Sequence, residues 1–129
     1  MRILLDTHAL LWWITDDPAL SPSASKLLRR TANSFFVSAA SAWEIATKFR
    51  LGKISQAASI ILELDQILAA ESFESLPISL EHATRAGLLP GPHKDPFDRM
   101  LIAQALSENL AVLSADTVFD SYQVRRLWD

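Results

Sequence analysis

The chain has 129 residues, of which 50% are hydrophobic, and this length and composition predict one folded domain over residues 1–129 rather than a disordered protein. It contains no cysteine, which excludes disulfides, thiolate metal sites and cysteine nucleophiles and fits a reducing compartment. The formal net charge is −3, with 15 Asp and Glu against 12 Lys and Arg, so the overall charge neither requires nor excludes a nucleic-acid partner.

The chain opens with an apolar run over residues 2–5 that predicts a buried strand, and residues 7–14 continue as an apolar helix. Asp6 and His8 interrupt this start too early for a secretory signal, and no segment of the sequence has the length and hydropathy of a membrane span. These features predict a cytoplasmic protein that does not bind a membrane.

Strand and helix patterns alternate along the rest of the chain. Caps, prolines at helix starts and apolar residues at helical spacing predict helices over residues 21–30, 39–50, 59–70, 80–88 and 97–109. Short apolar runs predict strands over residues 35–38, 73–78 and 111–114, with a short closing segment near 124–127. Strands separated by helices pair in parallel through right-handed crossovers. We therefore predict an α/β fold, a three-layer α/β/α sandwich with a mainly parallel central sheet.

Four carboxylates stand just past these apolar runs or within a following helix, and they are Asp6, Glu44, Asp98 and Asp116. Because ligands of open α/β sheets bind beyond the carboxyl ends of the strands, we expect these side chains to gather at one edge of the sheet. An acid that ends a strand buried on both faces pays a desolvation cost unless something compensates it. The recurrence therefore indicates a functional cluster.

Carboxylates held within a few ångströms of one another repel, and a hard divalent cation removes this conflict. A site with oxygen ligands only, in a chain without cysteine or suitably spaced histidines, favours Mg²⁺ or Mn²⁺ over zinc. Mg²⁺ commonly binds through one or two carboxylates together with phosphate oxygens. The cluster is therefore typical of metal-assisted phosphodiester hydrolysis.

Helix capping offers a structural explanation for two of these acids. Asp95, Pro96 and Asp98 fit an N-cap, a proline at the first helical position and an acid in the first turn. Ser41 and Glu44 fit a capping box. Under this alternative the carboxylates stabilise helix ends and bind no metal.

Other polar and aromatic residues carry weaker signals. His93 is the histidine expected near the crevice, because it lies in the proline-rich loop over residues 89–96, just before a helix start. Trp12, Trp13 and Trp43 are interpreted as core or oligomer contacts rather than as a platform for RNA bases. Basic side chains that could contact phosphate are Lys48, Arg50, Lys53, Lys94 and Arg99.

Four sequence segments resemble a PIN domain, and the similarity is closest to the VapC-type toxins of bacterial toxin–antitoxin modules. The segments are ILLDTH at 3–8, S-x-x-S-x-W-E at 38–44, HKDPFDRMLIAQA at 93–105 and LSADTVF at 113–119. The resemblance implies a Mg²⁺- or Mn²⁺-dependent endoribonuclease whose metal is held by Asp6, Glu44, Asp98 and Asp116. We predict substrate contacts for Thr7, Ser38, Arg99 and Ser114.

The same resemblance implies a type II toxin that cleaves RNA, forms a homodimer and binds a VapB-type antitoxin. The apolar helix faces at residues 10–14 and 60–68 could form a groove for an amphipathic partner helix. Two alternatives stay open: a catalytically inactive PIN-like module that binds RNA or protein, and a haloacid-dehalogenase-like phosphatase. The phosphatase fits less well, because the sequence has His8 where those enzymes typically carry a second aspartate.

Overall fold

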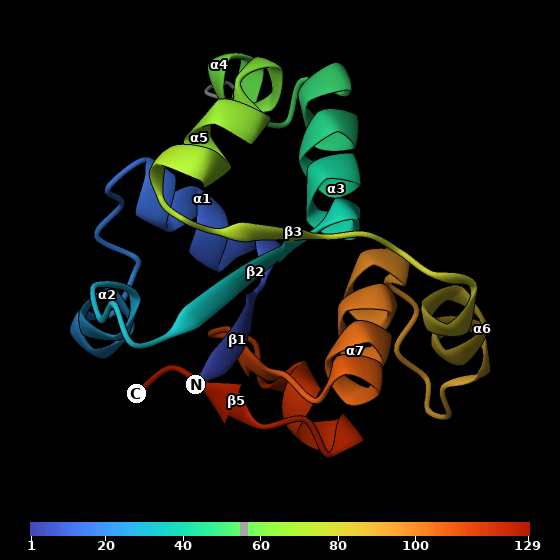
Figure 1. Ribbon diagram of the computed structural model, residues 1–129. Coiled ribbons are helices and arrows are strands. Elements are labelled where there is room, and N and C mark those ends of the chain that lie inside the picture. Colours follow the sequence, from blue (N-terminus) through green and yellow to red (C-terminus); the bar gives the residue numbers. More distant parts are fainter. Residues whose placement is uncertain (55–56) are drawn as a thin grey trace.

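A parallel sheet forms the centre of the computed structural model, which describes residues 1–54 and 57–129. The strands are β1 (Arg2–Leu5), β2 (Ser34–Ser38), β3 (Glu74–Leu76), β4 (Ala111–Leu113) and β5 (Arg126–Leu127). Their order across the sheet is β3-β2-β1-β4-β5, and every neighbouring pair is parallel (Figure 1). The predicted parallel pairing is therefore confirmed.

Helices make the connections that parallel strands require. They are α1 (Thr7–Ile14), α2 (Pro22–Leu28), α3 (Ala39–Arg50), α4 (Ala57–Leu62), α5 (Leu64–Ala70), α6 (Leu80–Leu88), α7 (Pro96–Glu108) and the 3₁₀ helix η1 (Thr117–Tyr122). In the described part of the chain, no helix combines the length and the hydropathy needed to cross a membrane.

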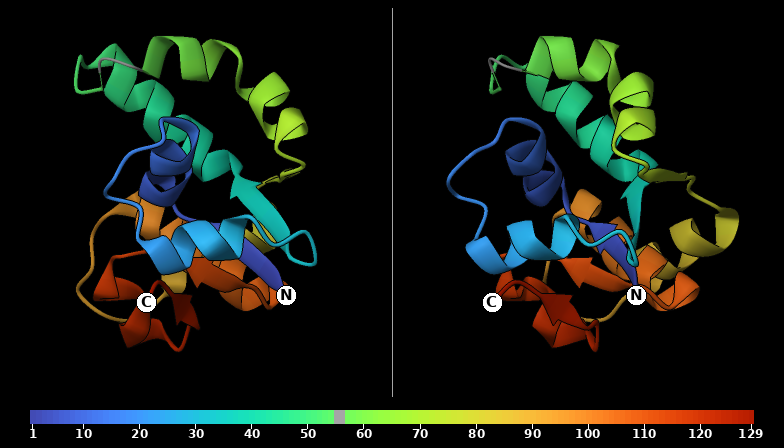
Figure 2. Two further views of the ribbon diagram at one scale, coloured as in Figure 1. Left: turned by 90° about the vertical axis from the view of Figure 1, so that its left-hand side faces the viewer. Right: turned by 60° about the vertical axis from the view of Figure 1, so that its left-hand side comes forward.

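Side chains of the central strand β1 alternate between the two faces of the sheet. Ile3 and Leu5 pack into one core with residues of α1, α2 and α5, whereas Leu4 packs into a second core with residues of α7 and η1. All three side chains are fully buried. Helices lie on both faces of the sheet (Figures 1 and 2), which confirms the three-layer α/β/α sandwich.

The segment predicted as one helix over residues 59–70 is two helices. α4 ends at Leu62 and α5 begins at Leu64, while Glu63 between them has φ −117° and ψ 17°. The break lets α4 pack on α3 and α5 pack on β3, and Figure 2 shows the two helices meeting at an angle. Ile60 and Leu68 are buried as the spacing predicted, so only the bend was missed.

Several other elements differ from the prediction in their bounds, most by a single residue. The helix predicted to reach residue 30 ends at Leu28, and η1 was not predicted. The strand predicted over residues 73–78 covers only Glu74–Leu76. Pro77 follows it directly, and proline has no N–H with which to continue a ladder.

Helix α3 begins one residue after β2, and its cap is Ser38. The Oγ atom of Ser38 accepts a hydrogen bond from the N–H of Ala40 at 2.9 Å. Ser41 therefore lies inside the helix, and the capping-box explanation for Glu44 is wrong. A capping box does occur at the start of α6, between Ser79 and His82.

Candidate active site

Strands β1 and β4 end next to each other, so the residues that follow them share one edge of the sheet. Leu5 is in register with Leu113, and the N–H of Asp6 donates to the carbonyl of Leu113 at 3.1 Å. The Oγ–H of Ser114 then donates to Oδ2 of Asp6 at 2.5 Å, and Oγ accepts from the N–H of Asp116 at 2.9 Å. The Ser114 hydroxyl thus joins two acids from opposite ends of the chain.

Asp6 and Asp116 each cap a helix at this edge. Oδ1 of Asp6 accepts from the N–H of Ala9 in α1 at 2.8 Å, and Oδ1 of Asp116 accepts from the N–H of Val118 in η1 at 3.0 Å. Free N–H groups at a helix start carry partial positive charge, which favours an anion. Both carboxylates are therefore held in place and partly compensated.

Helix α7 supplies the third acid. Its N-cap is Asp95, which accepts from the N–H groups of Phe97 and Asp98, and Pro96 is the first helical residue, as predicted. Oδ2 of Asp98 lies 2.9 Å from Nε2 of His93, the histidine expected near the crevice. Asp95 therefore acts as the cap, and the side chain of Asp98 is left to face the edge of the sheet.

Glu44 lies in the second turn of α3 and is buried, with 5% of its surface exposed. Its Oε2 atom pairs with Nζ of Lys48 at 2.6 Å. Lys48 is one of the basic residues that could contact phosphate, but its spacing of four residues from Glu44 on a helix is also a signal for an ion pair. The lysine compensates the charge of the buried carboxylate.

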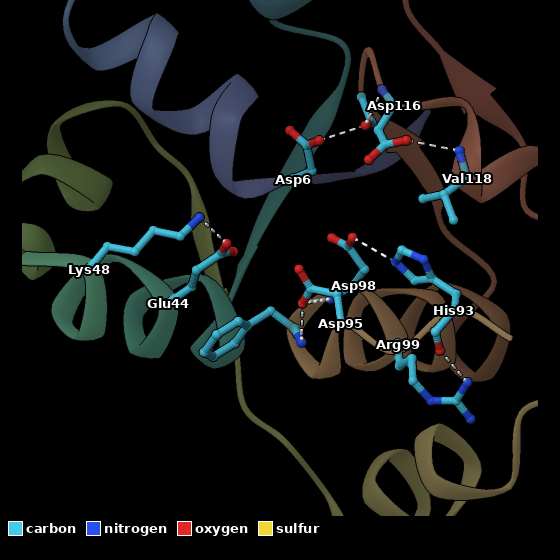
Figure 3. A network of polar contacts seen from close by, with 11 residues as sticks. Asp6, Glu44, Lys48, His93, Asp95, Asp98, Arg99, Asp116 and Val118 are labelled. Atoms are coloured by element: carbon cyan, nitrogen blue, oxygen red, sulfur yellow. Dashed lines mark hydrogen bonds and ion pairs between the residues drawn. The ribbon is translucent and has the colours of Figure 1, made fainter. Parts of the chain in front are cut away.

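Figure 3 shows the four acids around one space beyond the strand ends. The carboxylates of Asp98 and Asp116 point into this space, that of Asp6 is directed to the Ser114 hydroxyl beside Asp116, and that of Glu44 lies at the side, held by Lys48. Among the described residues, no three His, Asp or Glu side chains form a preformed metal cluster. The acids therefore lie around a common space but are not close enough together to form a ready-made metal site.

Burial raises the pKa of two of these acids. For Asp6 and Asp98 alike, desolvation is the main cause of the raised pKa. Hydrogen bonds from Ser114 to Asp6 and from His93 to Asp98 lower the pKa of the acceptor. The charge of Asp98 raises the pKa of Asp6, and that of Asp116 raises the pKa of Asp98. The acids therefore lie within electrostatic range of one another, a pattern typical of functional sites.

Three hydroxyl residues that were predicted to contact substrate have partners inside the protein. The hydroxyl of Thr7 donates to Oγ of Ser41 at 3.0 Å, and that of Ser38 donates to Oε1 of Gln104 at 2.5 Å. Ser114 joins the two acids described above. Thr7, Ser38 and Ser114 are each at most 3% exposed. Their hydroxyls hold the strand ends and helix starts together.

Arg99, the fourth residue predicted to contact substrate, donates to backbone carbonyl groups. Nε donates to the carbonyl of Ala86 at 3.1 Å, Nη1 to that of His93 at 3.0 Å and Nη2 to that of Leu89 at 2.7 Å. These carbonyls belong to the end of α6 and to the loop after it, so Arg99 fastens that loop onto α7. In Figure 3 its guanidinium points away from the four acids.

Gln104 was missed as a site residue, although it connects the two helices that carry Glu44 and Asp98. Its side chain is fully buried in α7, where Oε1 accepts from the α3 cap Ser38 and Nε2 donates to the carbonyl of Pro77 at 3.2 Å. The start of α3 is thereby fixed against α7. A polar residue in the apolar run Leu-Ile-Ala-Gln-Ala was the available sequence signal for a buried hydrogen-bond partner.

A cavity of about 360 Å³ lies beside the acids, against α1 and the segment that follows α3. Thr7 and Lys48 line the end next to Asp6 and Glu44. The remaining lining is mainly apolar, with charged residues of both signs, and includes Leu11, Trp12, Asp17, Lys53, Ile54 and Ile60. The apolar faces predicted at residues 10–14 and 60–68 thus contribute to one groove that leads to the acids.

The chain is similar in sequence to known proteins. The model of the PIN domain family matches residues 3–124. Ribonuclease VapC22 of Mycobacterium tuberculosis is 29% identical over 122 residues, which cover 94% of this chain and 92% of that protein.

Solved structures with the same fold include the following three. VapBC2 from Rickettsia felis, bound to a fragment of its promoter DNA, matches with a TM-score of 0.73 at 19% identity and covers 100% of both chains. VapC20 of Mycobacterium tuberculosis is described as a toxin that cleaves the sarcin-ricin loop. It matches with a TM-score of 0.73 at 13% identity and covers 98% of this chain and 99% of that chain. FitAcB from Neisseria gonorrhoeae matches with a TM-score of 0.70 at 21% identity and covers 97% of this chain and 96% of that chain. At these identities the matches show a common fold.

Proposed function

This chain belongs to the PIN domain family, and from that premise we propose that it is a metal-dependent endoribonuclease, the toxin of a type II toxin–antitoxin pair that acts in the cytoplasm as one domain of residues 1–129. The observation that carries the proposal is the meeting of Asp6, Glu44, Asp98 and Asp116 around one space (Figure 3). Similarity to a protein named as a ribonuclease supports RNA as the substrate.

The acids fit Mg²⁺ or Mn²⁺, and we assign the metal ligands to Asp6, Glu44, Asp98 and Asp116. All donors are oxygens, which hard divalent cations prefer. Mg²⁺ binds through one or two carboxylates with water and substrate phosphate, so it does not require a preformed cluster. Three of the four acids keep one carboxylate oxygen that has no hydrogen-bond partner among the described residues. These oxygens are Oε1 of Glu44, Oδ1 of Asp98 and Oδ2 of Asp116. When bound, the cation would polarise the phosphate and activate water.

The residues around the acids position them for this reaction. Ser114 orients Asp6 and Asp116 through a single hydroxyl, and Arg99 holds the loop from which His93 reaches Asp98. We propose that these contacts, together with those of Thr7 and Ser38, set the geometry of the carboxylates. On this view Thr7, Ser38, Arg99 and Ser114 act on the acids rather than on the substrate.

The chemistry predicts the ends of the cleaved RNA. Water attacks phosphorus, the bond from phosphorus to the 3′ oxygen of the preceding nucleotide breaks, and that oxygen takes up a proton. The products carry a 5′-phosphate and a 3′-hydroxyl. Attack by the 2′-hydroxyl of the RNA would instead leave a cyclic 2′,3′-phosphate.

A homodimer and a VapB-type antitoxin are the proposed protein partners. Solved complexes of VapBC and FitAB type share this fold, which supports a small partner protein. The groove lined by Leu11, Trp12 and Ile60 offers apolar contacts for an amphipathic segment, and it leads to the acids. An antitoxin seated there would reach the site, and a basic side chain on it would suit the four carboxylates.

Cleavage of single-stranded RNA by the purified protein tests the proposal. We expect cleavage with Mg²⁺ or Mn²⁺, none with EDTA, and 5′-phosphate and 3′-hydroxyl ends by mass spectrometry. Asp98→Asn should lower kcat by at least about 100-fold, the scale on which removal of a transition-state charge contact acts. Cyclic phosphate ends, or equal activity in EDTA, would contradict a metal-activated water.

Asp95→Asn is the matched control for Asp98→Asn. Both changes remove one negative charge from the first turn of α7, but Asp95 acts as the cap and asparagine caps equally well. We expect Asp95→Asn to keep nearly full activity. Loss of cleavage in both variants would indicate a structural role for these acids, whereas absence of cleavage by the wild-type protein would favour the inactive-module alternative. The phosphatase alternative receives no support from the family match.

A further inference from the structure

An aromatic pair lies next to the acids, and it joins the two helices that carry Glu44 and Asp98. Trp43 precedes Glu44 in α3, and Phe97 precedes Asp98 in α7. Their ring centroids are 4.9 Å apart at an interplanar angle of 78°, an edge-to-face contact. The two rings therefore link α3 to α7 at the residues that directly precede Glu44 and Asp98.

Trp43 is exposed although its neighbour in sequence is buried. The indole has 59% of its surface exposed, whereas Glu44 has 5%. Single exposed apolar side chains are common on protein surfaces, so the position of Trp43 beside Glu44 and against Phe97 carries the argument rather than its exposure alone. The other tryptophans, at 12, 13 and 128, are half-buried. Trp43 thus differs from them in offering its face to a ligand.

We propose that Trp43, supported by Phe97, is a stacking platform for a nucleobase of the RNA next to the bond that is cut. Bases stack on aromatic side chains when single-stranded RNA is recognised, and such stacking tolerates any base. A nucleotide whose phosphate lies at the carboxylates would place its base beside them, and the exposed indole of Trp43 directly precedes Glu44. The platform would hold the RNA while the acids act on the phosphate.

The charges around the platform favour RNA over a second copy of the chain. Arg50 lies seven residues after Trp43 on the same face of α3 and is exposed, and before Phe97 the exposed Lys94 is balanced by Asp95, whose carboxylate is taken up by the cap of α7. Thr47, between Trp43 and Arg50 on that face, is also polar. Basic side chains near an exposed ring suit the phosphates that flank a stacked base, whereas the core of a protein interface is depleted of charged residues.

The inference rests on the proposed ribonuclease function, and RNA binding tests it separately from cleavage. Binding is measured by fluorescence anisotropy of a short labelled single-stranded RNA that spans a mapped cut, with the Asp98→Asn protein so that the RNA stays intact. Trp43→Ala, added to this background, should weaken binding roughly 5- to 100-fold. Trp43→Phe, which keeps a ring, should retain most of the affinity.

A cycle between the ring and the base identifies stacking as the cause. An RNA that lacks the base beside the cut should bind more weakly to the protein with Trp43, and Trp43→Ala should then add no further loss. Leu80→Ala is the control, because Leu80 is 88% exposed and lies on α6. It should change neither binding nor cleavage.

Three binding results would overturn the platform: unchanged RNA affinity in Trp43→Ala, an equal loss of affinity in Leu80→Ala, and a further loss of affinity when Trp43→Ala binds the RNA that lacks the base. A fourth is the dissociation of a dimer by Trp43→Ala in sedimentation, which would assign the ring to a protein interface. If the wild-type protein cleaves no RNA, the proposed nuclease function fails, and Trp43→Ala is then compared with wild type for binding of single-stranded RNA of mixed sequence: a loss of affinity keeps the ring as a base-stacking site, and unchanged affinity removes it.

Discussion

Nζ of Lys48 lies 2.6 Å from Oε2 of Glu44, so one of the candidate metal ligands is paired with a cation of the chain itself. The pair follows from helical geometry, because residues four apart on α3 are neighbours. Lys48 also lines the cavity that leads away from the acids. The lysine therefore stands between the carboxylate and any ligand that approaches from that cavity.

Lys48→Met should separate the two roles of this lysine. Without it the buried Glu44 has no countercharge, and we expect the metal-free protein to lose about 1–2 kcal/mol of stability. The expected loss of stability is smaller than for breaking a fully buried ion pair, because the side chain of Lys48 is one-third exposed to solvent. Because a competing cation is removed, Mg²⁺ should bind more tightly. Urea unfolding and titration calorimetry measure the two effects. Lys53→Met, at an exposed lysine lining the same cavity, should show neither effect.

Asp6→Asn should make stability less dependent on pH. The folded protein raises the pKa of Asp6 above 3.8, so the contribution of this group to stability is complete below about pH 3.8 and is lost as the pH rises through the folded-state pKa. Asparagine keeps the cap of α1 and carries no charge. In EDTA, the difference in Tm between variant and wild type should therefore grow in favour of the variant as the pH rises.

In Mg²⁺ at neutral pH, the wild-type protein should become more stable than Asp6→Asn, the opposite of their order in EDTA. A ligand at about 100 times its Kd stabilises the folded state by about 2.7 kcal/mol, and Asp6→Asn should gain much less. Asp120→Asn, at a half-exposed surface acid paired with Arg126, is the control and should gain as much as wild type. An equal gain from Mg²⁺ in Asp6→Asn and wild type would show that Asp6 is not a ligand.

Arg99→Lys should weaken both the fold and the reaction. A lysine cannot reproduce the fork of hydrogen bonds to three carbonyls, so we expect a loss of about 2–4 kcal/mol. The loop of His93 would loosen, and kcat should fall about tenfold, as when a residue that orients a ligand is lost. Arg85→Lys, which loses one exposed bond to Ser107, should stay within about 0.5 kcal/mol of wild type. Unfolding curves and single-turnover cleavage distinguish the two outcomes.

Gln104→Leu should uncouple α3 from α7. The change leaves the buried hydroxyl of Ser38 and the carbonyl of Pro77 without their partner, at a cost of about 1–3 kcal/mol each. Adding Ser38→Ala should cost less in this variant than in wild type, with a coupling energy of about 0.5–3 kcal/mol from urea midpoints. Gln66→Leu, at an exposed position of α5, is the control. Additive losses would show that the two side chains do not act together.

Elements whose signals are local agree most closely with the sequence prediction. The bounds of β1, α1, α3 and α6 match it, because an apolar run, a cap or a helical period lies within each segment. The bend at Glu63 escaped prediction because it depends on α4 packing against α3 and α5 packing against β3. The apolar residues of segment 59–70 keep helical spacing on both sides of the bend, so their pattern predicts one continuous helix.

The four acids could be proposed from sequence because two of them end buried strands, where an uncompensated charge is costly. The tasks of Arg99 and Gln104 could not be deduced in that way. Their partners are Ala86 and Leu89 for the first and Ser38 for the second, all in segments that only the folded chain brings near α7. Every residue has a backbone carbonyl, so the residue types in the sequence do not indicate which carbonyl accepts a hydrogen bond from a given side chain.

The sequence by itself determined the alternation of strands and helices, the parallel sheet and the identity of the acids, because hydrophobic period, caps and strand-end charges act over a few residues. Only the tertiary structure decided which partner each polar group takes: Lys48 for Glu44, His93 for Asp98 and Ser114 for Asp6. It also decided that Trp43 faces outward while Glu44 faces inward. Hydrogen bonds and burial depend on distances between segments, and those distances exist only once both faces of the sheet are covered.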